Sequence, residues 1–224
     1  MLNQDTKIYD MKLNKAIMKN KLHRTSCIEK AMQTVEFMVS ISEASKIWLA
    51  GHSAGSAVAM LAGKNMAKRG NLLGSYLFNP PFVAAPTKRR HLVATCLITA
   101  ALTLLIRNNQ DMQHLDILFS DLSMWVPNLY IHPSDPICSG YIRYFKIREK
   151  MERHGVGRLE RLAPPYSLKG LLMKAFGKDY CSEELHLIPS ACVTTSCSSF
   201  LQAHGLDQWF GDDTVSDPVV HCYN

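Results

Sequence analysis

The residues best suited to chemistry lie at positions 51–55, which read Gly-His-Ser-Ala-Gly and fit the pattern Gly-x-Ser-x-Gly. A run of strand formers, 46–50, precedes them, and small apolar residues at helical spacing follow. At a sharp strand-to-helix turn of this kind the serine hydroxyl is exposed as a nucleophile, here Ser53. The backbone amide of Ala54, at the helix N-terminus, would then face a developing oxyanion. The alternative is a plain tight turn with an inert serine.

A serine nucleophile needs a histidine base and a carboxylate that orients it, in the chain order Ser, Asp, His. Asp135 is the best carboxylate, because it lies in the loop after a predicted strand, 128–132. Active-site groups of parallel sheets gather beyond the carboxyl ends of the strands. The alternative role for Asp135 is that of a turn former before Pro136.

Nine histidines compete for the role of base, and His204 is the one we select. It lies on a late turn beside Gly205, where the ring could reach over the sheet edge; the alternative is a solvent-facing or otherwise satisfied histidine. Four other histidines fit less well. His52 faces the wrong way for proton transfer, and His132 precedes Asp135 in the chain. His186 lies within a predicted strand, and His221 lies in the tail. For His52, beside the nucleophile, a packing or loop role is expected.

Predicted strands alternate with predicted helices along the chain, which indicates an α/β fold with a mostly parallel sheet and helices on both faces. The predicted strands are 46–50, 73–78, 128–132, 158–162 and 185–193. The predicted helices are 25–42, 54–68, 89–107, 112–124, 138–153 and 198–210, with Ser26 as the cap of the first. We expect one domain, 1–210, followed by a flexible tail, 211–224.

Composition narrows the function classes. The chain has 224 residues, 47% of them hydrophobic, and a net charge of +6 that is spread along the sequence, so nucleic-acid binding is not expected. The seven cysteines are scattered and lack paired metal-ligand spacing, which predicts no metal, no cofactor and reduced thiols in the cytoplasm. The uncharged run 92–106 is too short to span a membrane and predicts a buried or interfacial helix.

Several segments resemble, in order, the plant lipase-like proteins related to class 3 lipases. They are Ile-Trp-Leu-Ala-Gly-His-Ser-Ala-Gly-Ser-Ala at 47–57, Tyr-Leu-Phe-Asn-Pro-Pro-Phe at 76–82, and the stretches 125–130, 135–138 and 203–209. The resemblance implies an α/β-hydrolase that acts on carboxylic esters of lipids, with Ser53, Asp135 and His204 as its triad. It also implies that 92–124 is a helical lid or acyl-binding insertion. Partners would be a lipid or small ester substrate and, peripherally, a membrane; the oligomeric state is open.

The sequence departs from this family at two places. Ala54 stands where such lipases usually have leucine, a mild change because the backbone amide acts there. Family members also carry an upstream strand ending in a Phe-Arg-Gly-Thr-like turn that supplies a second oxyanion donor, and this sequence has no such segment. The expected fold therefore lacks the usual N-terminal strands, and loss of one donor typically lowers turnover about 100- to 1,000-fold. The alternative function is an impaired, truncated α/β-hydrolase that acts as a binding or interaction protein.

Overall fold

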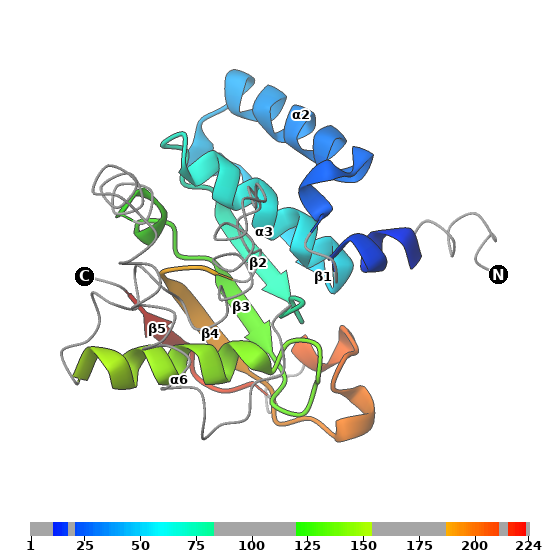
Figure 1. Cartoon of the computed structure of the whole chain (residues 1–224), viewed down its shortest axis with the longest axis vertical. Helices are drawn as coiled ribbons and strands as arrows, with labels where there is room; N and C mark the ends of the chain where they lie inside the picture. Colours follow the sequence, from blue (N-terminus) through cyan, green and yellow to red (C-terminus); the bar gives the residue numbers. More distant parts are fainter. Residues whose placement is uncertain (1–10, 18–20, 83–119, 154–186, 211–214, 223–224) are drawn as a thin grey trace, which may run out of the picture.

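The computed structural model of the chain describes residues 11–17, 21–82, 120–153, 187–210 and 215–222. Their centre is a five-stranded sheet in the order β1-β2-β3-β4-β5 (Figure 1). The strands are β1 Trp48–His52, β2 Gly74–Phe78, β3 Asn128–Ile131, β4 Ala191–Thr195 and β5 Val219–His221. The first four are parallel and β5 is antiparallel to β4. The predicted mostly parallel sheet of an α/β-hydrolase-like fold is confirmed.

The helices that the periodicity predicted begin and end close to the expected residues. They are α2 Ser26–Ile41, α3 Ala54–Ala67 and α6 Gly140–Arg153. The cap of α2 is one residue earlier than predicted, because the Thr25 hydroxyl, and not Ser26, accepts the hydrogen bond from the Ile28 amide. Strand boundaries shift by a few residues at most for β1, β2 and β3.

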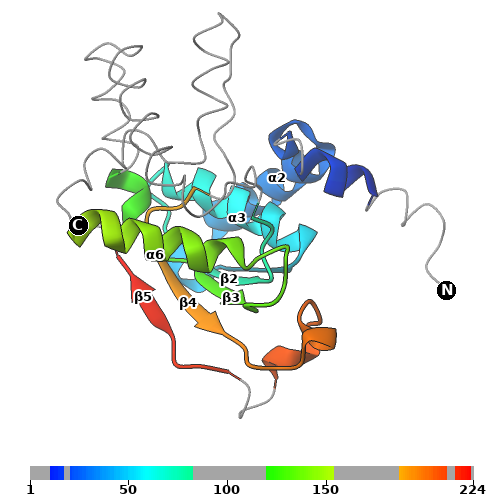
Figure 2. The ribbon, with the colours of Figure 1, turned by 60° about the horizontal axis from the view of Figure 1, so that its bottom comes forward.

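The α-helices α2, α3 and α6 lie on one face of the sheet, as Figure 2 shows. The Tyr141 hydroxyl of α6 contacts the Met60 sulfur of α3 at 3.4 Å, and Phe145 of α6 stacks on His221 of β5. The core between helices and sheet includes the fully buried Leu77 and Leu129. Helices were predicted on both faces. The α-helices of the described part lie on one face, and on the other face Trp209, from a short 3₁₀ helix, packs against Phe78 and Tyr130.

The opposite face carries aromatic residues that remain partly open. Trp48 is 72% exposed, and its T-shaped partner Tyr76 is half-buried on the neighbouring strand. The strands alternate between buried and exposed positions here, so they are not the continuous buried runs expected of a sheet covered on both sides. In the sequence, apolar side chains on this face give the same pattern as core residues. This explains why helices were predicted on both faces of the sheet.

The C-terminal part differs most from the prediction. The predicted helix 198–210 is wrong: two short 3₁₀ helices, Phe200–Gln202 and Asp207–Trp209, flank a turn at Gly205. The predicted strand 185–193 is shifted to Ala191–Thr195. The expectation of a flexible tail over 211–224 is also wrong for its described part, because β5 pairs with β4 there and so satisfies the backbone of that edge.

Several expectations lie outside the described residues or stay predictions. The helix 89–107, the apolar run 92–106, the strand 158–162 and most of the insertion 92–124 lie outside them; of that insertion, residues 120–123 are helical. No helix of the described part has the length and apolarity needed to cross a membrane. The extent of the single domain, 1–210, stays a prediction.

Candidate active site

The turn from β1 into α3 holds Ser53 in a backbone conformation that non-glycine residues rarely adopt. Its φ is +52° and its ψ is −119°, and its amide donates to the carbonyl of Phe78 on β2 at 2.9 Å. Such a conformation typically costs about 1–3 kcal/mol and persists where surrounding structure fixes it. Here the ladder to β2 and the start of α3 provide that fixation, and the hydroxyl stands at the carboxyl end of the sheet.

The two glycines beside the serine do different work. A Cβ at Gly51 would lie 2.5 Å from the carbonyl carbon and oxygen of Gly55 and 2.6 Å from the amide of Ser56. Only glycine therefore lets β1 and α3 approach this closely. A Cβ at Gly55 would meet nothing within 4 Å. Of the two glycines in the Gly-x-Ser-x-Gly pattern, only the first is therefore required for steric reasons.

The start of α3 presents a backbone donor next to the serine. The amides of Ser56 and Ala57 bond back to the carbonyl of Ser53, at 3.0 and 3.3 Å, and close the first turn. The amide of Ala54, the first helical residue, has no acceptor within the helix and lies at the positive end of the helix dipole. Ala54 therefore has the placement expected of an oxyanion donor.

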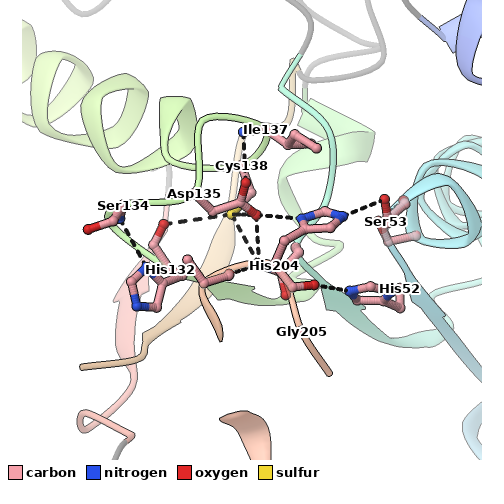
Figure 3. Close-up of polar contacts among 12 residues, drawn as sticks. His52, Ser53, His132, Ser134, Asp135, Ile137, Cys138, His204 and Gly205 are labelled. Carbon is pink, nitrogen blue, oxygen red and sulfur yellow. Dashed lines mark hydrogen bonds and ion pairs between the residues drawn. The ribbon is translucent and has the colours of Figure 1, made fainter. Parts of the chain in front are cut away.

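The structure brings together the three side chains that the sequence selected (Figure 3). The Ser53 Oγ lies 3.0 Å from His204 Nε2, and His204 Nδ1 lies 2.8 Å from Asp135 Oδ2. The imidazole is thus held between the hydroxyl and the carboxylate, with its two nitrogens on opposite partners. Ser53 comes from the end of β1, Asp135 from the loop after β3, and His204 from the turn after β4.

Asp135 is buried, 1% exposed, yet its surroundings favour the ionised form. Burial alone would raise the pKa of Asp135, but hydrogen bonds lower it below its ordinary value, the largest from His204 and others from the Ile137 amide, Asn79 and Cys138. An ionised carboxylate in this place fixes the His204 tautomer with a proton on Nδ1. Nε2 is then free to accept a proton from Ser53.

The turn that carries His204 is held by side chains from both sides. His52 Nε2 lies 2.9 Å from the His204 carbonyl oxygen, so His52 contacts the backbone of the base and not the nucleophile. Gln208 donates from Nε2 to the carbonyls of Ala203, at 2.9 Å, and Gly205, at 2.8 Å. The His204 ring is 39% exposed, which leaves it accessible beside a well-anchored backbone.

The two other candidate histidines that the structure describes, His132 and His221, have partners other than Ser53. His132 accepts from the Ser134 amide on Nδ1 and lies 3.0 Å from the Ser198 carbonyl through Nε2. His221 stacks on Phe145, and burial lowers its pKa. His186 lies outside the described residues. Within the described residues no group of three or more His, Cys, Asp or Glu side chains could hold a metal ion.

Two residues that contact the Asp135 carboxylate were not predicted from the sequence. Asn79 and Cys138 both contact Asp135 Oδ2, at 2.8 and 3.2 Å. In the sequence Asn79 stands before two prolines, and Cys138 is one of seven scattered cysteines. The rule that placed Asp135 beyond a strand end applies equally to Asn79, which directly follows β2. That rule could have found Asn79, whereas nothing in the sequence pattern singles out Cys138.

Comparison with known proteins finds matches among lipases and esterases. A family described as Lipase (class 3) matches residues 3–111. A GDSL esterase/lipase from Arabidopsis thaliana is 38% identical over 225 residues, which cover 92% of this chain and 63% of the relative. The sequence Gly-Asp-Ser-Leu does not occur in this chain. No solved structure matches. Both matches support the resemblance to plant lipase-like proteins. The chain spans 63% of the length of the curated relative that it matches.

Proposed function

We propose that this plant lipase-like protein is a serine carboxylic ester hydrolase that works through an acyl-enzyme. The observation that carries the proposal is the unbroken contact from the Ser53 hydroxyl through both nitrogens of His204 to the Asp135 carboxylate. The class 3 lipase match and the esterase/lipase relative supply the ester as substrate class.

In the first half of the reaction His204 Nε2 takes the proton of Ser53 as Oγ forms a bond to the ester carbonyl carbon. The carbonyl oxygen becomes an oxyanion, and the Ala54 amide donates to it. The imidazolium then gives its proton to the alkoxy oxygen as the carbon–oxygen bond breaks. The alcohol leaves, and the acyl group stays on Ser53.

The second half reverses the roles of the same groups. His204 takes a proton from water, whose oxygen attacks the acyl carbonyl, and then returns the proton to Ser53 Oγ as the acid leaves. Asp135 stays ionised throughout and stabilises the imidazolium in each half. An alcohol in place of water would make the reaction acyl transfer, which the same residues support.

An apolar, lipid-like acyl group fits the surface beside the base. Phe200 and Leu201, on the 3₁₀ helix before His204, are 72% and 94% exposed. Exposed apolar side chains next to an active site favour lipid-like substrates and peripheral contact with a lipid surface. No cofactor or metal takes part in the proposed steps. The cytoplasmic location expected from the sequence stays a prediction.

Hydrolysis of short-chain p-nitrophenyl esters tests the proposal. Wild type is expected to hydrolyse them, and Ser53→Ala to fall to the buffer rate while keeping the same thermal unfolding curve. Ser199→Ala is the matched control, because Ser199 is an exposed serine whose side chain makes no cap hydrogen bond at the adjacent 3₁₀ helix. If the wild-type protein is folded and does not hydrolyse these esters, the alternative is favoured: a binding or interaction protein that uses the region around Ser53.

A further inference from the structure

Asn79 sits at the end of β2 in a conformation that few residues tolerate. Its φ is +47°, it is fully buried, and its amide donates to the Tyr130 carbonyl at 2.8 Å. Asparagine is among the few non-glycine residues that adopt this left-handed conformation readily. Glycine would adopt it more easily, so the backbone alone does not account for an asparagine here. The contacts of the side chain give the reason.

The side-chain amide of Asn79 joins the loop after β3 to the segment after β4. Its nitrogen donates to Asp135 Oδ2 at 2.8 Å and to the Ala203 carbonyl at 2.9 Å, and it lies 3.6 Å from the Cys138 sulfur. Its oxygen accepts from Trp209 Nε1 at 2.9 Å. Asparagine has two amide hydrogens, and these two short bonds use both. One hydrogen thus goes to the carboxylate of the site and the other to the residue before His204.

We propose that Asn79 is a positioning residue that fixes the distance between Asp135 and the turn of His204 and tunes how strongly the carboxylate holds a protonated His204. The inference rests on the proposed function. The short hydrogen bonds of the Asn79 side chain go to Asp135, Ala203 and Trp209 and not to Ser53, so Asn79 acts through Asp135 and the turn of His204. Asn79 follows the end of β2, and from there its side chain bonds to the loop after β3 and to the turn after β4. These bonds hold the two segments in a fixed position relative to each other.

Loss of the side chain has two separable consequences. The carboxylate loses a donor, so more of its negative charge is directed at the imidazole and the imidazolium is stabilised. The acid limb of the kcat/KM profile then moves to higher pH. The Ala203 carbonyl keeps its bond from Gln208, at 2.9 Å, so the turn stays folded but loses its tie to Asp135. A displacement of about 1 Å at a reacting group can lower turnover about 100-fold.

Asn79→Gly is the sharpest variant, because glycine keeps the left-handed backbone and removes only the side-chain contacts. Asn79→Asp is the second variant: it keeps the shape and places a carboxyl against Asp135, so the pair must share a proton. Asn128→Ala is the matched control. Asn128 is a half-buried asparagine on β3 whose side chain donates to the Ser75 carbonyl at 3.3 Å.

For Asn79→Gly we expect cooperative unfolding, a kcat on a short-chain ester lower by about 100-fold, a KM close to wild type, and an acid limb of the kcat/KM profile shifted to higher pH. Asn128→Ala should keep the wild-type profile. If Asn79→Gly does not fold, Asn79→Asp decides: a lower kcat is expected, because a carboxyl that shares a proton with Asp135 cannot also donate to the Ala203 carbonyl. A folded variant of either kind with wild-type kcat and acid limb would overturn the inference.

A second readout separates this inference from the proposed function. The proton that His204 Nδ1 shares with Asp135 is expected at low field in the NMR spectrum, and in Asn79→Gly it should shift or exchange faster. If wild type has no hydrolysis and no serine labelling, the proposed function fails, and this resonance still tests the positioning. An unchanged resonance in folded Asn79→Gly would then refute the role of Asn79.

Discussion

Adding one methyl group to each glycine of the serine turn should give opposite results. In Gly51→Ala the new Cβ lies 2.5 Å from backbone atoms of Gly55, and ordinary contact begins at 3.4 Å. The strand and the helix must therefore separate by about 0.9 Å. No flexible side chain can absorb this movement, because the atoms that the Cβ meets belong to the backbone of α3. Overpacking of this kind typically costs about 1–3 kcal/mol.

The same movement reaches the chemistry. It displaces the first turn of α3, which carries the Ala54 amide, relative to the Ser53 hydroxyl at the end of β1. A displacement near 1 Å corresponds to about a 100-fold loss in turnover. Gly55→Ala is the matched control. Its Cβ meets nothing within 4 Å, and alanine in a helix is about 0.5–1 kcal/mol better than glycine.

Urea unfolding and ester hydrolysis measure both effects. Gly51→Ala should lose about 1–3 kcal/mol of unfolding free energy and most of its turnover, whereas Gly55→Ala should be as stable as wild type or more so and remain active. Equal stability and activity of the two variants would show that β1 and α3 do not approach each other this closely at Gly51.

Two further predictions concern the acid and its neighbour. Because hydrogen bonds lower the folded pKa of Asp135 below its ordinary value of 3.8, its ionised form contributes stability that is fully present above that value and is lost as pH falls through the lower folded pKa. The unfolding free energy of wild type should therefore exceed that of Asp135→Asn by about 2 kcal/mol near pH 7, and the gap should narrow below about pH 4; a constant gap would contradict this. Burial raises the pKa of the Cys138 thiol, so iodoacetamide should modify the exposed Cys197 in the native protein and Cys138 only after unfolding, as peptide mass spectrometry can establish.

The sequence predicted those parts of the site whose signal is local. The strand, the turn at Ser53 and the helix α3 follow one another directly, so the change from strand formers to helical spacing marks all three. Asp135 and His204 could be selected because their order and their places after strands are visible in one dimension. Their distances to one another are shown only by the structure.

The parts that sequence missed depend on approach in space. Asn79 was not predicted as a site residue, because nothing nearby in sequence indicates that the loops after β3 and β4 would reach its side-chain amide. The strand β5 has only three residues, too few for a periodic pattern, and forms because β4 offers it an edge. Trp48 resembled a core residue, although it lies on the open face of the sheet.

Covalent labelling with a fluorophosphonate measures whether His204 activates Ser53. We expect one adduct, located on Ser53 by mass spectrometry, and labelling at least about 100-fold slower in a folded His204→Ala variant, since general bases typically contribute 100- to 10,000-fold. An adduct on another residue, or equally fast labelling without the imidazole, would show that His204 does not activate Ser53.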